Sequence, residues 1–204
     1  MLIKTLPVGQ LETNCYVVTN EETLGCVVID PGDESNYILN YLEENHLKCE
    51  AIFLTHGHFD HVGAVPAVAE QTGAPVYICP RDDANLTHNR YYSFPLPENG
   101  HHYDEGDILR IAGLTFEILA TPGHTPGGVC IICENAIFCG DTLFRGSCGR
   151  VDLPGGDMME ELKSLKRLCD LPGDYEVYPG HMDSSTLERE RNFNYYCREA
   201  KRRF

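Results

Sequence analysis

Basic residues are scarce in this sequence, and their scarcity excludes one class of partner. Only 16 lysine and arginine residues stand against 31 aspartate and glutamate residues, which gives a formal net charge of -15. A chain of this charge has no general attraction to the phosphates of nucleic acid or to an anionic membrane. We therefore expect neither as a partner.

Long apolar runs are missing too. No stretch approaches the roughly 18 consecutive apolar residues of a membrane-spanning helix, and Lys4, Pro7 and Gln10 interrupt the opening segment. We expect no membrane span and no secretion signal, and hence a cytoplasmic protein whose ten cysteines stay reduced and mostly buried. Cys130 and Cys133 have the spacing of some redox and zinc motifs. Residues three apart on a strand point to opposite faces, however, which favours ordinary packing.

The sequence shows no internal repeat or low-complexity segment, and its 204 residues suit one globular domain. Short apolar runs bounded by turn residues predict strands at 15–19, 25–30, 51–54, 75–79, 108–111, 114–119, 128–133, 136–139 and 175–178. Helical spacing predicts helices after Gly32 and at 65–71, 158–168 and 186–203, whereas 80–102 is expected to form a long surface loop with one helical turn. Because both halves mix strands with helices, we expect an α/β fold of two mixed β-sheets flanked by helices. A single domain would span residues 1–204, with 186–204 as a short C-terminal helical segment.

The densest group of chemically active side chains follows the predicted strand at 51–54. It consists of His56, His58, Asp60 and His61. His56 and His58 are two apart, so an extended chain directs both to one side. Imidazole nitrogen and carboxylate oxygen are the ligands that a zinc-like ion prefers, and Asp60 and His61 can face a second position from the turn into the next helix. The segment therefore predicts a metal site rather than a polar loop that happens to be rich in histidine.

Three later strands end in a similar way, each with a glycine followed by one ligand-type side chain: His124, Asp141 and His181. In open α/β sheets, ligands collect at the carboxyl ends of the strands. Seven groups exceed what one tetrahedral ion can use, but two ions sharing Asp141 could use them all. Such a pair, about 3.5–4 Å apart, could hold a hydroxide between the ions. We expect two divalent metal ions, zinc first, with iron or manganese as alternatives.

At this point the pattern resembles a known family. His-x-His-x-Asp-His at 56–61, followed by a single histidine, an aspartate and a further histidine, is similar to the metallo-β-lactamase superfamily over residues 13–181. The resemblance implies an αββα sandwich. The ligands it implies are His56, His58 and His124 for one metal and Asp60, His61 and His181 for the other, with Asp141 bridging them. It also implies that Asp60 is the catalytic residue that orients the hydroxide, and that Asp30 hydrogen-bonds to a ligand from outside.

Within the superfamily, the sequence is most similar to glyoxalase II-type hydrolases, especially the short bacterial forms. The stretches that carry this likeness are 121–127, 140–144 and 149–154. It implies hydrolysis of hydroxyacyl-thiol esters such as S-lactoylglutathione, so the partner of the site would be a small-molecule thioester. Full-length forms carry a longer C-terminal helical region whose basic residues grip glutathione, whereas only 186–204 is available here. The substrate could therefore carry a different thiol in place of glutathione, or be a different acyl ester.

Other classes of protein use nearly the same residues. A persulfide dioxygenase would bind one iron through His56, His124 and Asp141, and a lactonase or phosphodiesterase would direct the two-metal hydroxide at an oxygen ester. Flavodiiron proteins normally have Glu in place of His58 and β-lactamases commonly have Cys in place of Asp141, so neither is favoured. A binding module with a structural metal is a further alternative, but such sites usually close four ligands, often thiolates, around one ion.

Two arginines follow the Asp141 motif closely. We expect Arg145 and Arg150 to bind a carboxylate of the substrate, with structural ion pairs as the alternative. His46 and His88 lack partners at ligand spacing and are expected at the surface. The sequence predicts no particular oligomeric state.

Overall fold

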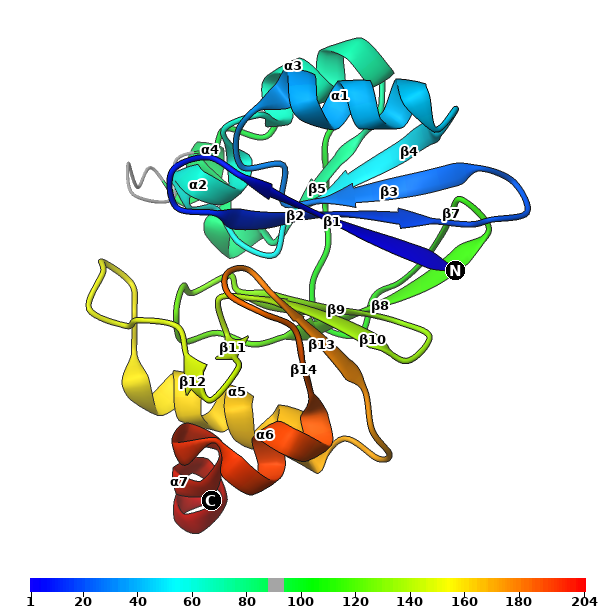
Figure 1. Cartoon of the computed structure of the whole chain (residues 1–204). Coiled ribbons are helices and arrows are strands. Elements are labelled where there is room, and N and C mark those ends of the chain that lie inside the picture. Colours follow the sequence, from blue (N-terminus) through cyan, green and yellow to red (C-terminus); the bar gives the residue numbers. More distant parts are fainter. Residues whose placement is uncertain (88–93) are drawn as a thin grey trace.

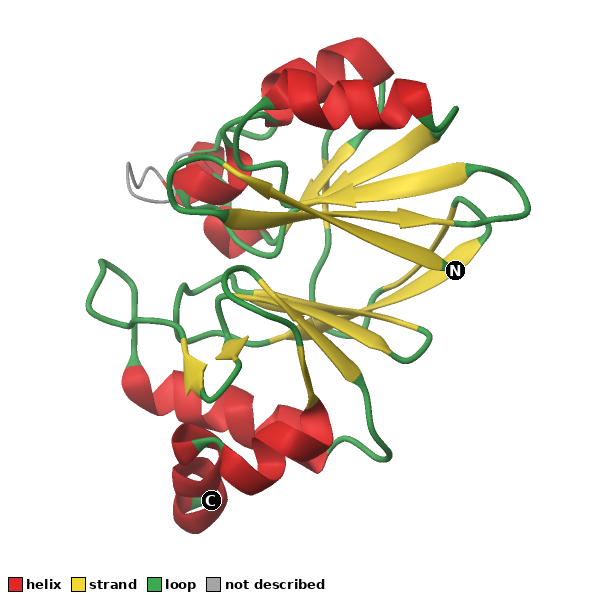
Figure 2. Ribbon diagram, viewed as in Figure 1, coloured by secondary structure: helices red, strands yellow, loops and turns green. Residues whose placement is uncertain are grey.

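Two β-sheets pack face to face, and helices cover the outer face of each sheet (Figure 1, Figure 2). The computed structural model describes residues 1–87 and 94–204. Each sheet combines parallel with antiparallel strand pairs. The predicted class of fold, an αββα sandwich of two mixed sheets flanked by helices, is confirmed.

The first sheet is built from the N-terminal half of the chain. In spatial order its strands are β1 (Leu2–Val8), β2 (Thr13–Thr19), β3 (Gly25–Ile29), β4 (Lys48–Phe53), β5 (Val76–Ile78) and β6 (His101–His102). The first three strands are antiparallel neighbours, whereas β3 to β6 run parallel and need crossover connections. Two of these crossovers contain α1 (Ser35–Glu44) and α3 (Val65–Thr72), which cover the outer face of this sheet (Figure 1).

The second sheet comes from the C-terminal half. In spatial order its strands are β14 (Ser185–Thr186), β13 (Glu176–Pro179), β10 (Ala136–Gly140), β9 (Val129–Cys133), β8 (Leu114–Ala120) and β7 (Ile108–Ile111). Its outer face is covered by α5 (Met158–Asp170), α6 (Leu187–Phe193) and α7 (Tyr195–Arg203), seen in Figure 1. A small hairpin of β11 (Leu143–Phe144) and β12 (Ser147–Cys148) forms a separate two-stranded sheet.

The main apolar core lies between the two sheets. Phe53 of β4 makes edge-to-face contacts with Tyr103 and with Phe116 of β8, at ring-centroid distances of 5.8 and 5.2 Å. Strands β2, β3, β9 and β10 are buried along their whole length, which explains the continuous apolar sequences of β3, β9 and β10. Cys133 packs into this core, whereas Cys130 packs into the cluster beneath α5. Their spacing therefore reflects strand packing, as expected, and all ten cysteines are free and buried.

The C-terminal segment is helical, as expected, but it forms two helices rather than one continuous helix. Asn194 separates α6 from α7, and its side-chain oxygen accepts hydrogen bonds from the backbone N–H groups of Tyr196 and Cys197. This caps the start of α7. The side-chain nitrogen of Asn194 donates to the carbonyl oxygens of Phe144 and Ser147. Asn194 thus connects the C-terminal helices to the β11–β12 hairpin through hydrogen bonds.

The segment expected to be a long loop, residues 80–102, contains short regular elements. It begins with the 3-10 helix η1 (Pro80–Asp82) and one helical turn, α4 (Ala84–Thr87), and it ends in β6, which pairs with β5. Residues 88–93 lie outside the described residues, together with the prediction for His88, while His46 is exposed as expected. Within the described ranges, no helix combines the length and the apolar character needed to cross a membrane.

Candidate metal centre

The fold brings all seven predicted ligand residues together at one edge of the two sheets. His56 and His58 lie between β4 and the short helix α2 (Phe59–Val62), Asp60 and His61 lie within α2, and His124, Asp141 and His181 follow β8, β10 and β13. At the end of β10, the pairing with β13 shifts register between Phe138 and Gly140. Such a bulge bends a strand and redirects the next side chain, which here is the carboxylate expected between the two metals.

Two glycines allow the ligand-bearing segments to pack this closely. A Cβ atom at Gly180 would lie 2.2 Å from Oδ1 of Asp141, and a Cβ atom at Gly32 would lie 1.7 Å from the carbonyl oxygen of Asp60. Neither distance is possible between non-bonded heavy atoms, so any larger residue would push the carboxylate or α2 out of place. These glycines are therefore part of the geometry of the site.

The first cluster consists of His56, His58 and His124, whose ligand-type nitrogens lie within 4.8 Å of one another. Nδ1 of His124 donates to the carbonyl oxygen of Arg150 at 2.7 Å. Nδ1 of His56 lies 3.1 Å from the hydroxyl oxygen of Thr55. Holding Nδ1 in this way sets the tautomer of each ring and leaves the lone pair of Nε2 for an ion.

The second cluster consists of Asp60, His61 and His181, which again place ligand-type atoms within 4.8 Å of one another. Nε2 of His181 lies 3.2 Å from Oδ2 of Asp60, and Nε2 of His61 lies 3.7 Å from the same oxygen. Nδ1 of His181 donates to the carbonyl oxygen of Leu11 at 3.1 Å, while the hydroxyl of Thr13 donates to Asp60 at 3.2 Å. The β1–β2 turn and the first residue of β2 thus orient two of the three groups.

Asp141 lies between the two clusters. Its Oδ1 is 3.4 Å from Nε2 of His61, and its Oδ2 is 3.5 Å from Nε2 of His124 and 3.6 Å from Nε2 of His181. One carboxylate therefore faces a histidine of the first cluster and two histidines of the second. This is the placement that a shared ligand requires.

Several buried atoms of the site lack the partners that burial normally demands. Nε2 of His56, Nε2 of His61 and Oδ1 of Asp141 have no hydrogen-bond partner among the described residues. Burying such atoms without a partner costs about 1–3 kcal/mol each. Divalent cations would satisfy all three, and imidazole with carboxylate is a suitable ligand set for zinc, iron or manganese. The residues present therefore fit a divalent metal site.

Asp30, directly after β3, supports the site from outside, as expected from the family resemblance. Its Oδ2 lies 2.9 Å from Nδ1 of His61 and accepts from the hydroxyl of Thr55 at 2.6 Å. Its Oδ1 accepts from the backbone N–H of Thr55 at 2.8 Å. Through these contacts Asp30 turns Nε2 of His61 toward the centre and holds the hydroxyl that contacts His56.

The charges of the site shift the pKa values of its members. Burial and the neighbouring histidines lower the pKa of His56 well below its usual value, and they lower the pKa of His58 to about 4. Both rings are neutral at pH 7 and offer lone pairs. Burial would raise the pKa of Asp60, but the hydrogen bond with His181 and the other histidine charges outweigh it and hold that pKa below its usual range. Asp60 is therefore an ionised carboxylate.

A buried carboxylate that the sequence analysis missed joins the two loops of the first cluster. Oδ2 of Asp82 accepts from the backbone N–H of Gly57 at 3.1 Å and from the hydroxyl of Thr125 at 2.7 Å, and its Oδ1 accepts from the N–H of Gly127 at 2.7 Å. Gly57 lies between two histidines of the cluster, and Thr125 directly follows the third. Glu161 of α5 adds a further missed contact, because it accepts from the N–H of His124 at 3.0 Å.

Replacing Asp82 by Ala is expected to lower the free energy of unfolding by about 3 kcal/mol, since three buried donors lose their acceptor. Urea unfolding followed by circular dichroism measures the change. Asp104→Ala is the matched control, because Asp104 forms a half-exposed pair with Arg81, and such pairs contribute about 1 kcal/mol or less. Equal losses in the two variants would contradict the role assigned to Asp82.

The metal centre opens into a pocket of about 610 Å³, lined in part by His58, Asp60, His124, Asp141 and His181. Arg150 also lines this pocket, and its guanidinium pairs with Asp152 through contacts of 2.7 and 2.8 Å. Arg145 is not among the described lining residues, and it pairs with Asp183 at 3.1 Å. Contact between substrate and these two arginines stays a prediction.

The sequence matches the family model described as the metallo-beta-lactamase superfamily over residues 8–181. It is 33% identical to a protein of Haemophilus influenzae named hydroxyacylglutathione hydrolase GloC, with 95% of this chain and 97% of that protein covered.

Two solved structures resemble the fold over nearly its whole length. BLEG-1 B3 metallo-beta-lactamase superposes with a TM-score of 0.85 at 33% identity, covering 96% of this chain and 99% of that one. TTHA1623 in a di-iron-bound form superposes with a TM-score of 0.80 at 39% identity, covering 95% of this chain and 99% of that one. With its sandwich fold and its histidine and aspartate cluster, the chain belongs to the metallo-β-lactamase superfamily.

Proposed function

We propose that this protein is a dinuclear metal-dependent hydrolase that cleaves small-molecule thioesters, in the manner of glyoxalase II. The observation that carries the proposal is the arrangement of two three-residue clusters on either side of one carboxylate, Asp141, at the pocket. A closed structural site would not need seven ligand-type groups or an open pocket. We propose zinc as the metal, and the di-iron form of TTHA1623 supports iron as the alternative.

We assign the residues of the site to metal binding and to the positioning of water. His56, His58 and His124 would hold one ion, and Asp60, His61 and His181 the other, with Asp141 shared. Bound ions of this kind supply Lewis acidity, which polarises a carbonyl group and makes water acidic enough to be deprotonated near pH 7. Asp60 is ionised, lines the pocket and is held by Thr13 and His181. We assign it the positioning of the attacking water.

In the proposed reaction, the oxygen of water forms a bond to the carbonyl carbon of the thioester. The carbon–sulfur bond then breaks, and its electron pair goes to sulfur. One proton of the water ends on the thiol and the acyl group leaves as a carboxylic acid. The choice of a thioester is supported by the Haemophilus relative, whose name states hydrolysis of hydroxyacylglutathione.

A substrate panel tests this proposal. The zinc-loaded protein is offered S-lactoylglutathione, a lactone, a phosphodiester, a β-lactam and a persulfide. Thiol release from the thioester is followed with a colorimetric reagent, and the loss of each other substrate is followed by chromatography. We expect the thioester to be cleaved with the highest kcat/KM. Faster turnover of the lactone, phosphodiester or β-lactam would reject the thioester assignment, and oxygen consumption with the persulfide by a one-iron form would favour the dioxygenase.

A further inference from the structure

Exposed apolar side chains surround the mouth of the metal-centre pocket. Leu11 is 55% exposed, Phe59 is 70% exposed and Met182 is 64% exposed, and all three line the pocket. Phe144 and Leu153 line it as well. The side chains come from separate segments of the chain: the β1–β2 turn, α2, the β11–β12 hairpin, the loop before α5 and the loop after β13. Apolar side chains gathered around a catalytic pocket indicate a binding surface for an apolar ligand.

The charges near this mouth do not favour a highly charged substrate. Arg150 is held by Asp152 through two hydrogen bonds, and Arg145 is held by Asp183. A carboxylate of the substrate would have to compete with these aspartates, and the net charge of the chain, -15, adds repulsion. An uncharged apolar group meets neither obstacle.

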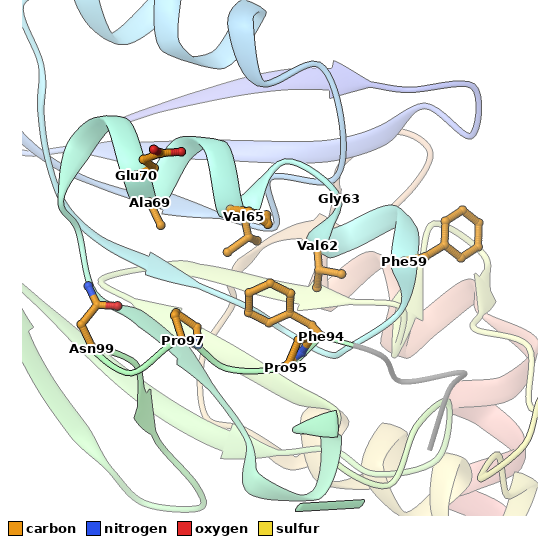
Figure 3. Close-up of a pocket in the computed structure, with 11 residues that line it drawn as sticks. Phe59, Val62, Gly63, Val65, Ala69, Glu70, Phe94, Pro95, Pro97 and Asn99 are labelled. Atoms are coloured by element: carbon orange, nitrogen blue, oxygen red, sulfur yellow. The ribbon is translucent and has the colours of Figure 1, made fainter. Parts of the chain in front are cut away.

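A second pocket, of about 620 Å³, also has Phe59 in its lining (Figure 3). Val62 of α2 and Val65 of α3 face Phe94 across it, and Figure 3 shows Phe59 at one end and Asn99 at the opposite end. Its lining is mainly apolar, and Phe59 lines both this pocket and the pocket of the metal centre. We call this second pocket the Phe94 groove. It continues the apolar surface away from the metal centre.

We propose that the protein prefers thioesters of apolar acyl chains, which bind across Phe59 and extend into the Phe94 groove. The reacting carbonyl would lie at the metal centre, and the thiol carrier would leave through the mouth of the pocket. This inference rests on the proposed hydrolysis of thioesters and adds the class of acyl group. Phe59 lines both pockets, so an acyl chain that leaves the metal centre across Phe59 reaches the Phe94 groove.

The test is a series of thioesters with one thiol and acyl chains from acetyl to octanoyl, compared with S-lactoylglutathione on the zinc-loaded protein. Burial of one methylene is expected to raise kcat/KM about two- to fourfold, so octanoyl, with six more methylenes, should exceed acetyl by at least about 60-fold. If kcat/KM stayed constant or fell with acyl-chain length while thioesters were still hydrolysed, the preference for apolar acyl chains would be overturned and the proposed hydrolysis would stand. No hydrolysis of any thioester would instead overturn the proposed function.

The variant Ala69→Phe tests the contribution of the Phe94 groove independently of the metal centre. Ala69 lines the Phe94 groove from α3, so a phenyl ring there should abolish the gain for octanoyl while leaving acetyl hydrolysis unchanged. Gln71→Phe is the matched control, because Gln71 is exposed on the same helix and outside the described lining. Loss of the chain-length preference in Ala69→Phe but not in Gln71→Phe supports the inference. A preference for octanoyl that survives in both variants contradicts it.

Discussion

Replacing Asp60 by Asn is expected to lower kcat for thioester hydrolysis by about 10² or more, because the attacking water loses the charged group that positions it. The carboxylate of Asp60 is ionised and lines the pocket, with Thr13 and His181 in contact with it. An amide at this position keeps the shape of the side chain but lacks the negative charge that orients a water molecule or holds an ion. Steady-state kinetics with the zinc-loaded protein, joined to circular dichroism and elemental analysis, measures the effect.

The control for Asp60→Asn is Asp183→Asn. Asp183 is 83% exposed and pairs with Arg145, so the same chemical change there should leave kcat within a factor of two or so of the unchanged protein. If Asp60→Asn retained full activity, Asp60 would have no catalytic role. If it lost the fold along with the activity, the less drastic Thr13→Val would still report on the orientation of Asp60 through kcat.

Removing the metal ions with a chelator is expected to abolish hydrolysis, by at least ~10³ in rate, because ions of this kind contribute several kcal/mol of transition-state stabilisation. The apo protein should also melt about 5–10 °C lower than the protein in metal at a hundred times its Kd. The physical reason is that buried atoms without a hydrogen-bond partner, such as Nε2 of His56, lose the partner that an ion supplies. Calorimetry and thiol release, measured on the same sample, check both effects.

Re-addition of zinc, iron or manganese to the apo protein serves as the control for metal removal. Recovery of both the melting temperature and the activity shows that the chelator did not damage the protein. A chelated protein that kept its activity would contradict the proposed hydrolase. A protein that regained stability but never activity would favour the binding module with a structural metal.

The candidate site could be predicted from the sequence because its chemistry is local. His56, His58, Asp60 and His61 lie within one turn after a buried strand, and His124 and Asp141 each follow a strand and a glycine. A strand end fixes where such side chains point, and parallel strands gather their carboxyl ends at one edge. The fold class followed from the same mixture of strands and helices. Local patterns were sufficient for these features.

Other features could not be predicted because they depend on contacts between distant segments. Asp82 reaches Gly57 and Gly127, which are 25 and 45 residues away in the sequence. Its own segment has no periodicity that would mark it as buried. The apolar side chains around the mouth of the metal-centre pocket come from five separate segments. The break between α6 and α7 at Asn194 depends on the contacts of that residue with the β11–β12 hairpin. Strands such as β6 and β14 have two residues each and carry no recognisable pattern.

Metal content per chain, measured by elemental analysis on protein purified without added metal and then loaded with zinc, tests the central claim most directly. We predict two metal ions per chain, with one lost when Asp141 is replaced by Asn and both lost after chelation. One tightly bound iron, with no second ion even at excess zinc, would contradict the two-metal centre.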